Sequence, residues 1–455
     1  MGQKMEGSVC MEKDFQTEKY LFRGLSRREF VKYGLSASAL TVGALSKLNA
    51  GIYQSLKTLD QKHIQDESPD GVYWNAVRRH FLFEDGVIMM NNGTVGPMPK
   101  PVFNTLMKVF KIQATNPFDV YNDLPREKER VRKKVAQFIN ADPEEVILTR
   151  NTTEGINFVV NGMKLMEGDE VLLSTMEHPG GRNPWTLKAK RYGIKINWVP
   201  IGLPPASVDE FVAGFEKALT PKTKVISISH TVYISGLISP LKELCKMAHE
   251  KGLLVLADGA HAIGMLDLNM KEMDVDFYAT SPYKWMGAPT GMGVLFMKRE
   301  HQKNIWPTIA SGGWDTYEDA RKFETVGQRA EALIVALGEA VDFQNQIGKQ
   351  RIERRIKALA GYFKQELKKI QGVRLHTSED PYISGGLTAF SIEGLEPKKI
   401  VEYVRGKYNI VIRTVGRKEK GTYGIRVSTH IYVTFKHVDM LLEGIRHLVK
   451  HRAQA

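Results

Sequence analysis

Short apolar runs alternate with amphipathic stretches through the middle of the chain. Runs of strand length lie at 145–149, 170–173, 195–201, 223–230 and 253–258, and the stretches between them have the apolar spacing of helices. Strands that alternate with helices run mostly parallel, and the helices cover both faces of the sheet. The pattern therefore predicts an α/β fold, and residues 291–298 predict one more strand that closes this domain.

The pattern changes after Arg299. A loop with Gly and Trp leads to a long helix from Ala330 and an amphipathic helix at 350–370, and shorter strands are expected around residues 386–433 before a last helix. This order predicts a smaller α+β domain. We place the large domain at 101–315 and the small C-terminal domain at 316–455.

Residues 51–100 are expected to form an N-terminal arm. Within the arm, apolar residues 87–90 lead into Asn91, Asn92, Gly93 and Thr94, which is the pattern of a short strand entering a polar turn. A plain loop explains the same residues, so both interpretations stay open.

The first fifty residues have the order of a twin-arginine export signal. Residues 26–32, SRREFVK, precede an uncharged stretch at 33–46, and small residues follow near Ser46 and Ala50. An amphipathic surface helix with a chance Arg pair is the alternative. The order predicts export to the periplasm, and no segment has the length of a stable membrane span.

Composition removes several classes of function. The formal net charge is +13, but acidic and basic residues are interspersed, so nucleic acid is not implied. The two cysteines, Cys10 and Cys245, exclude a disulfide framework and a Cys-rich metal site. The histidines show no metal-binding spacing, and we predict no metal. A Gly-rich nucleotide turn, a Walker A sequence and a GxSxG elbow are also missing from the sequence.

The stretch from Leu253 to Gly291 contains the candidate chemistry. Two strand-like runs end in polar turns that carry Asp258 with His261 and Ser281 with Lys284. Alone, such a lysine is usually solvated and such an aspartate is usually a turn residue. Together at neighbouring strand ends, they suggest a Schiff-base lysine and a carboxylate that protonates the pyridine nitrogen of pyridoxal phosphate.

The stretch NTTEG at 151–155 follows a strand and opens a helix. Free amides at a helix start suit a phosphate, but Asn and Thr there are equally explained as helix caps. This pattern favours the phosphate site and the helix cap equally.

Most of the chain from Phe81 to Val449 resembles the class V aminotransferase family of fold-type I pyridoxal-phosphate enzymes, near the cysteine desulfurases and isopenicillin N epimerase-like proteins. The shared motifs are NTTEGIN, STMEHPGGRNPW, ISHTVYISG, LADGAHA, SPYKWMGAPTG, FETVGQR and IRVSTHIY. The resemblance implies a homodimer in which Lys284 forms the Schiff base, Asp258 pairs with the ring nitrogen and His178 stacks on the ring. The implied phosphate ligands are Thr152, Thr153 and Ser281. The other implied cofactor contacts are His261, Tyr233 and Tyr283, and the implied substrate contacts are Arg426 and Asn92, with Arg413 competing for the substrate carboxylate.

The chain departs from the family pattern at several positions. His261 replaces a frequent Gln, Tyr283 replaces the His of desulfurases, and Tyr233 replaces a frequent Asn. Gln328 or Gly327 stands where the resemblance implies a phosphate-binding Thr from the second subunit. No cysteine lies between Arg413 and Arg426, where a desulfurase has its thiolate, so persulfide formation is not expected.

These observations predict a pyridoxal-phosphate enzyme that acts at the amino group and α-carbon of an amino-acid-type substrate. An epimerase or a transaminase is favoured. A C–S or β-elimination lyase without a catalytic cysteine, a lysine acting without pyridoxal phosphate, and a non-catalytic exported ligand-binding relative are the alternatives. A preserved Lys284 and Asp258 argue against the last of these.

Overall fold

The structure, a computed structural model, describes residues 49–62, 71–202, 204, 207–416 and 423–451. The predicted export signal lies outside the described residues except for its last two positions. The described residues form one compact unit. Of the helices that the structure describes, none combines the length and apolar composition that crossing a bilayer requires.

A seven-stranded sheet forms the centre of the large domain. Its order is β2-β8-β7-β6-β5-β3-β4. Strands β3 to β7 pair in parallel, whereas β8 lies antiparallel between β7 and β2. The bounds are β2 (Val146–Thr149), β3 (Glu170–Ser174), β4 (Lys195–Val199), β5 (Thr223–Ser229), β6 (Leu254–Asp258), β7 (Phe277–Thr280) and β8 (Gly293–Met297). The predicted α/β fold with a mostly parallel sheet is confirmed.

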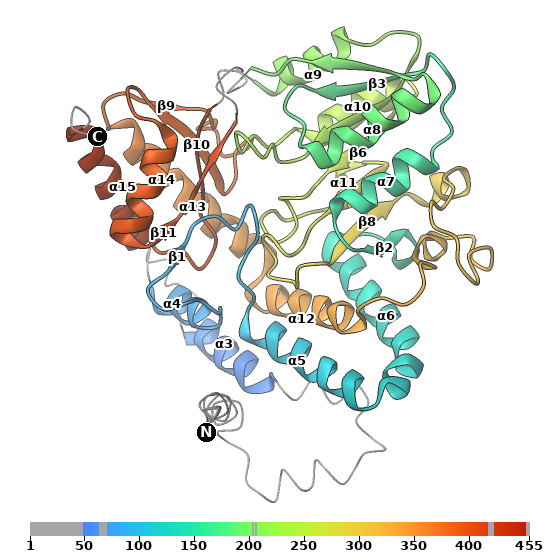
Figure 1. Ribbon diagram of the computed structural model, residues 1–455, viewed down its shortest axis with the longest axis horizontal. Helices are drawn as coiled ribbons and strands as arrows, with labels where there is room; N and C mark the ends of the chain where they lie inside the picture. Colours follow the sequence, from blue (N-terminus) through green and yellow to red (C-terminus); the bar gives the residue numbers. More distant parts are fainter. Residues whose placement is uncertain (1–48, 63–70, 203, 205–206, 417–422, 452–455) are drawn as a thin grey trace, which may run out of the picture. The chain divides into compact units, whose positions relative to one another are not determined.

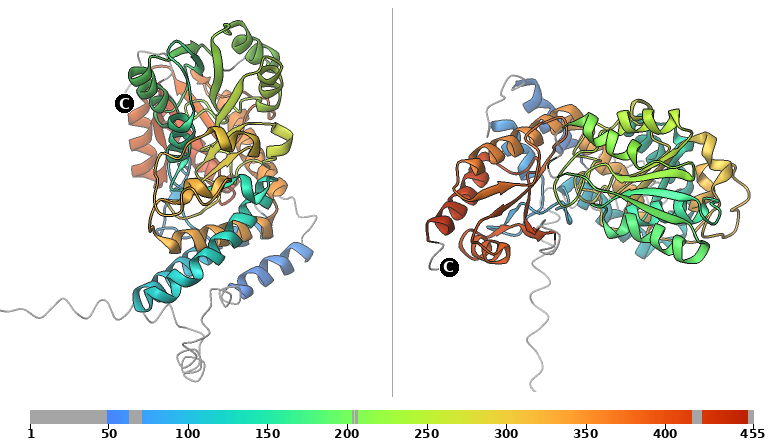
Figure 2. Two further views of the ribbon diagram at one scale, coloured as in Figure 1. Left: turned by 90° about the vertical axis from the view of Figure 1, so that its right-hand side faces the viewer. Right: turned by 90° about the horizontal axis from the view of Figure 1, so that it is seen from above.

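Helices cover both faces of this sheet, as the right-hand view of Figure 2 shows. They are α7 (Thr152–Gly162), α8 (Pro179–Tyr192), α9 (Val208–Lys217), α10 (Leu241–Glu250) and α11 (Met270–Met273). Val159 and Val160 of α7 pack in one core cluster with Leu173, Leu256 and Leu295 of the strands, all fully buried. Each such side chain contributes roughly 1.5–3 kcal/mol by leaving water. The sheet is therefore a rigid base for the loops at its strand ends.

The N-terminal helices are α3 (Ala50–Lys62), α4 (Val72–Arg79), α5 (Lys100–Thr115) and α6 (Pro117–Ile139). Helix α12 (Glu331–Ile347) packs along α5 and α6, as Figure 1 shows in orange and cyan. The helical spacing of residues 125–139 predicts a helix that starts at Pro125. That start was wrong, since the helix begins at Pro117 and contains Pro125 in its interior.

The small domain contains a four-stranded antiparallel sheet of order β12-β13-β10-β9. Its strands are β9 (Val373–Leu375), β10 (Leu387–Ile392), β12 (Arg413–Val415) and β13 (Gly424–Ser428), and its helices are α13 (Lys349–Lys368), α14 (Pro397–Tyr408) and α15 (Phe435–Lys450). Strand β1 (Ile88–Met89) of the arm pairs in parallel with β11 (Ile410–Val411). The strand interpretation of residues 87–90 is therefore correct, while the domain boundaries near residues 100 and 315 stay predictions.

The remaining elements are 3-10 helices: η2 (Pro143–Glu145), η3 (Arg299–Asn304) and η4 (Ala320–Glu324). Glu324 of η4 is buried and pairs with Arg132 of α6 at 2.5 Å. The second carboxylate oxygen of Glu324 pairs with Lys128. These ion pairs hold η4 against α6, and η4 also contacts β2.

Candidate active site

Asp258 and Lys284 follow neighbouring parallel strands. Asp258 is the last residue of β6, and Lys284 lies in the turn after β7. Burial raises the pKa of Asp258, against a hydrogen bond of 3.0 Å from the Ala260 amide to its Oδ1. Burial also lowers the pKa of Lys284 to about 8, and the charge of Asp258 acts against that shift. The two groups thus share one buried electrostatic environment.

His261 lies beside the lysine amine. Its Nδ1 accepts from Trp285 Nε1 at 3.4 Å, and its Nε2 lies 3.3 Å from Lys284 Nζ. Burial and the charge of Lys284 hold the pKa of His261 well below its usual value, so the ring is neutral. His261 is therefore a neutral, buried ring in contact with the lysine amine.

Hydroxyl groups gather at the start of α7. Thr152 Oγ1 and Ser281 Oγ lie 2.7 Å apart, and the Thr152 amide donates to Ser281 Oγ at 3.1 Å. The helix cap is Asn151, whose Oδ1 accepts from the Glu154 amide at 2.9 Å. Capping therefore does not account for Thr152 and Thr153. Their hydroxyls and the helix start form a cradle of the kind that binds phosphate.

His178 caps α8 beside this cradle. Its Nδ1 accepts from the Gly180 amide at 3.0 Å, and its ring meets Tyr233 edge-on at 4.9 Å. Burial and the charge of Lys284 lower the pKa of His178 to about 4, so the ring is neutral near pH 7. A Cβ at Gly180 would approach Thr153 Oγ1 to 2.5 Å. The close approach places His178 next to the predicted phosphate end.

Glu177 is a site residue that the sequence reasoning missed. It is buried, and the hydroxyls of Ser174 and Ser229 donate to its two carboxyl oxygens. Ser229 is the register partner of Asp258. Burial raises the pKa of Glu177 to about 7, against these hydrogen bonds. Glu177 therefore joins the turn that carries His178 to the strand beside Asp258, and nothing in its local sequence distinguishes it from a surface glutamate.

Arg426 and Asn92 are the two residues that the sequence predicted to contact the substrate. Arg426 is 1% exposed and donates from Nη1 to the Tyr233 carbonyl at 3.0 Å, but its buried Nε has no partner. Asn92 Nδ2 donates to the Lys284 carbonyl at 3.2 Å, and its buried Oδ1 has no partner. Tyr283 accepts a hydrogen bond from the Gly96 amide through its carbonyl. The side-chain role predicted for Tyr283 stays a prediction.

This set of residues fits pyridoxal phosphate. The cofactor needs an amine, a carboxylate for its ring nitrogen, an aromatic face and a phosphate cradle. A Cβ at Gly181 would lie 3.1 Å from Asp258 Oδ2, so glycine leaves more room around this carboxylate beside α8. Lys284 would hold the aldehyde carbon, and Thr152, Thr153 and Ser281 would hold the phosphate.

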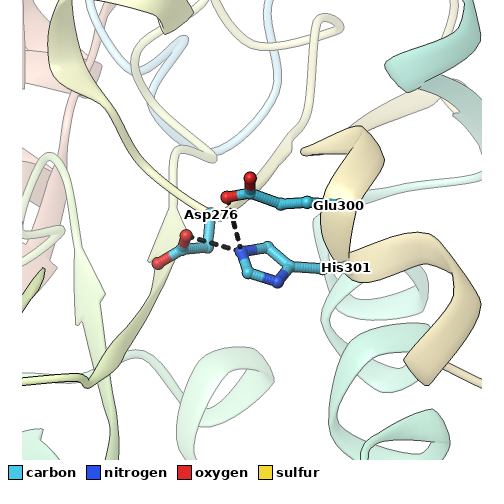
Figure 3. A group of neighbouring side chains, drawn as sticks. All are labelled: Asp276, Glu300 and His301. Carbon is cyan, nitrogen blue, oxygen red and sulfur yellow. Dashed lines mark hydrogen bonds and ion pairs between the residues drawn. The ribbon is translucent and has the colours of Figure 1, made fainter.

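The residues closest to metal-binding geometry in the described chain lie elsewhere. Asp276, Glu300 and His301 have ligand atoms within 4.8 Å of one another (Figure 3). Asp276 directly precedes β7, at the end opposite to Lys284, and Glu300 and His301 belong to η3. His301 Nε2 lies 2.8 Å from Asp276 Oδ1, and His249 and Lys298 also contact this carboxylate. These contacts already occupy Asp276, so the group is an ion-pair cluster.

The pKa of Lys284 predicts how the cofactor-free protein captures pyridoxal phosphate. Only the neutral amine attacks, so the rate should rise about tenfold per pH unit up to about pH 8 and then level off. The growth of the Schiff-base absorption at different pH values measures this rate. A simple alkylamine is the control, and its rate should keep rising to about pH 10. A protein rate that also rises without a plateau would contradict the expectation.

Known proteins resemble the chain around this site. Residues 89–441 match the family model described as Aminotransferase class-V. Isopenicillin N epimerase from Streptomyces clavuligerus is 28% identical over 82% of this chain and 97% of its own. A probable cysteine desulfurase from Halalkalibacterium halodurans is 31% identical over 70% of this chain and 81% of its own. A solved mutant of C-DES, with glycine covalently linked to its pyridoxal phosphate, shares the fold at a TM-score of 0.74, with 24% identity over 81% of this chain and 98% of its own.

Proposed function

The chain belongs to the class V aminotransferase family, whose cofactor is pyridoxal 5'-phosphate, and from that membership we propose that it is an epimerase or transaminase of an amino-acid-type substrate. The observation that carries the proposal is the convergence of Lys284, Asp258, His178 and Arg426 on one site. These residues provide an amine, a buried carboxylate, a neutral ring and an unsatisfied guanidinium.

Each residue has a distinct task in this proposal. When bound, the cofactor withdraws electrons from the substrate's α-carbon. Arg426 binds the substrate carboxylate with parallel N–H donors. Lys284 would move the α-proton as a general base, and its pKa of about 8 suits that task near neutral pH. Asp258 would hold the ring nitrogen of the cofactor protonated, and His178 would cover the ring.

Desulfuration through a cysteine is disfavoured, although some relatives are probable cysteine desulfurases. No cysteine lies between Arg413 and Arg426. Cys245 is buried in α10, and burial raises the pKa of its thiol far above the usual value. A protonated thiol in a helix does not attack a substrate sulfur.

The reaction is tested with purified protein loaded with cofactor. Separate L- and D-amino acids are incubated in D₂O, with and without a 2-oxo acid, and chirality, deuterium at the α-carbon, keto acid and ammonia are measured. Loss of chirality with deuterium uptake supports an epimerase, and keto acid formed only with an added 2-oxo acid supports a transaminase. Ammonia release would instead support the lyase alternative. No deuterium uptake with any substrate, in protein that retains its cofactor, would support a ligand-binding relative.

Two further parts of the proposal concern assembly and location. Phe118 and Tyr121 of α6 are 69% and 55% exposed, stack on each other, and line a cavity of about 310 Å³ with Gln328. Exposed aromatic rings of this kind favour a homodimer across this face, which light scattering would measure.

The SRREF motif supports export by the twin-arginine route, which a reporter fused to residues 1–50 would test.

A further inference from the structure

Two arginines converge on one threonine at the substrate end of the site. Arg413 of β12 and Arg426 of β13 are direct register partners in the small sheet. Arg413 Nη1 and Arg426 Nη2 each donate to Thr94 Oγ1 at 3.1 Å. Two positive side chains thus meet at a single neutral oxygen of the arm.

Neither arginine forms an ion pair with a described acidic residue. The other acceptors of Arg426 are the Tyr233 carbonyl and Asn91 Oδ1, and Arg413 Nε donates to the Thr414 carbonyl. All of these acceptors are neutral, and Arg426 Nε has none. Burial and the charge of Arg413 lower the pKa of Arg426 to about 9. Two adjacent cations with no acidic partner among the described residues favour negative charge supplied by a ligand.

The two guanidinium groups differ in depth. Arg426 is buried, and its charge lowers the pKa of Lys284 and of His261 more strongly than the charge of Arg413 does. Arg413 is exposed. Arg426 therefore lies nearer to the Lys284 amine, and Arg413 lies farther from it, closer to solvent.

We propose that the substrate carries two carboxylates, with Arg426 binding the one on the α-carbon and Arg413 binding a second, more distant one. The substrate class is then an α-amino dicarboxylic acid or a compound that contains one. This inference rests on the proposed function, because it assigns the α-carboxylate to Arg426. It adds a role for Arg413 as a specificity-determining residue.

The experiment titrates the absorption of the bound cofactor with a homologous series of L-amino dicarboxylic acids and with their side-chain amides. The acid that fits best should bind at least about tenfold more tightly than its own amide, a difference of about 1.4 kcal/mol. Arg413→Gln should abolish this advantage. Arg426→Gln should weaken the acids and the amides together, because both carry the α-carboxylate.

Arg374→Gln is the matched control. Arg374 is an exposed arginine of β9 in the same sheet, outside the site, and its loss should leave the acid-over-amide ratio as in the wild type. Equal binding of acid and amide throughout the series would overturn the inference. So would an Arg413→Gln protein that weakens acids and amides equally, because the two arginines would then share one carboxylate. If no amino acid changes the absorption, the proposed function fails and the inference falls with it.

Discussion

Lys284→Ala is expected to lower turnover by at least about 10³-fold, because one side chain both holds the cofactor and moves the substrate proton. The protein should still bind pyridoxal phosphate without a covalent link, since the phosphate cradle and Asp258 remain. Borohydride reduction followed by peptide mass analysis measures the link. Label is expected on the peptide that contains Lys284 in the wild type and on no peptide of the variant.

Lys364 supplies an internal control for this labelling. It is a buried lysine of α13 whose pKa burial also lowers to about 8, and its Nζ donates to Ser384 Oγ and the Ser378 carbonyl, each at 2.7 Å. A reactive amine alone would therefore label both lysines. Label on Lys364, or equal label on both, would contradict the assignment of Lys284.

Asp258→Asn is expected to lower turnover by about 10²–10³-fold, the loss typical for one preorganised electrostatic group. The amide has nearly the same shape as the carboxylate but does not hold the ring nitrogen protonated. Nitrogen NMR of labelled cofactor reads that proton directly, independently of turnover. A ring nitrogen that stays protonated in the variant would show that another group performs this task.

Asp276→Asn is the matched control, because it removes a buried carboxylate at the other end of the same sheet. Burial alone would raise the pKa of Asp276, but hydrogen bonds from His301 and His249 outweigh it and lower the pKa to about 2. A lowered pKa stabilises the fold above about pH 4, and this contribution is lost as the pH falls towards 2. The control should therefore lose about 2 kcal/mol of unfolding free energy at pH 7 and keep the wild-type cofactor spectrum.

The alternation of apolar runs and helices was sufficient to predict the large sheet, because strand burial is a local property of composition. It also placed Asp258 and Lys284 together, since neighbouring parallel strands end at one edge. The cap of α7 cannot be identified from the sequence, because Asn151, Thr152 and Thr153 are all cap residues by type. Helix α6 begins eight residues before Pro125, and it packs along α12, a contact between distant segments that periodicity does not show.

Contacts between distant segments set the rest of the site. Glu177 is held in the site by hydrogen bonds from two serines, one of them more than fifty residues away in the chain. The meeting of Arg413 and Arg426 depends on the register of β12 and β13, and sequence patterns leave register open when both strands are short. The two arginines were therefore predicted as competitors, whereas they lie side by side.

The groups around the side chain of Arg426 come from three separate pieces of the chain. Arg426 belongs to the small sheet, Thr94 and Asn91 belong to the arm, and the Tyr233 carbonyl belongs to the large domain. A ligand carboxylate on Arg426 should hold these three pieces together more firmly than a decarboxylated amine does. Protease nicking of the arm should accordingly slow when an acidic ligand is bound and remain fast with the corresponding amine.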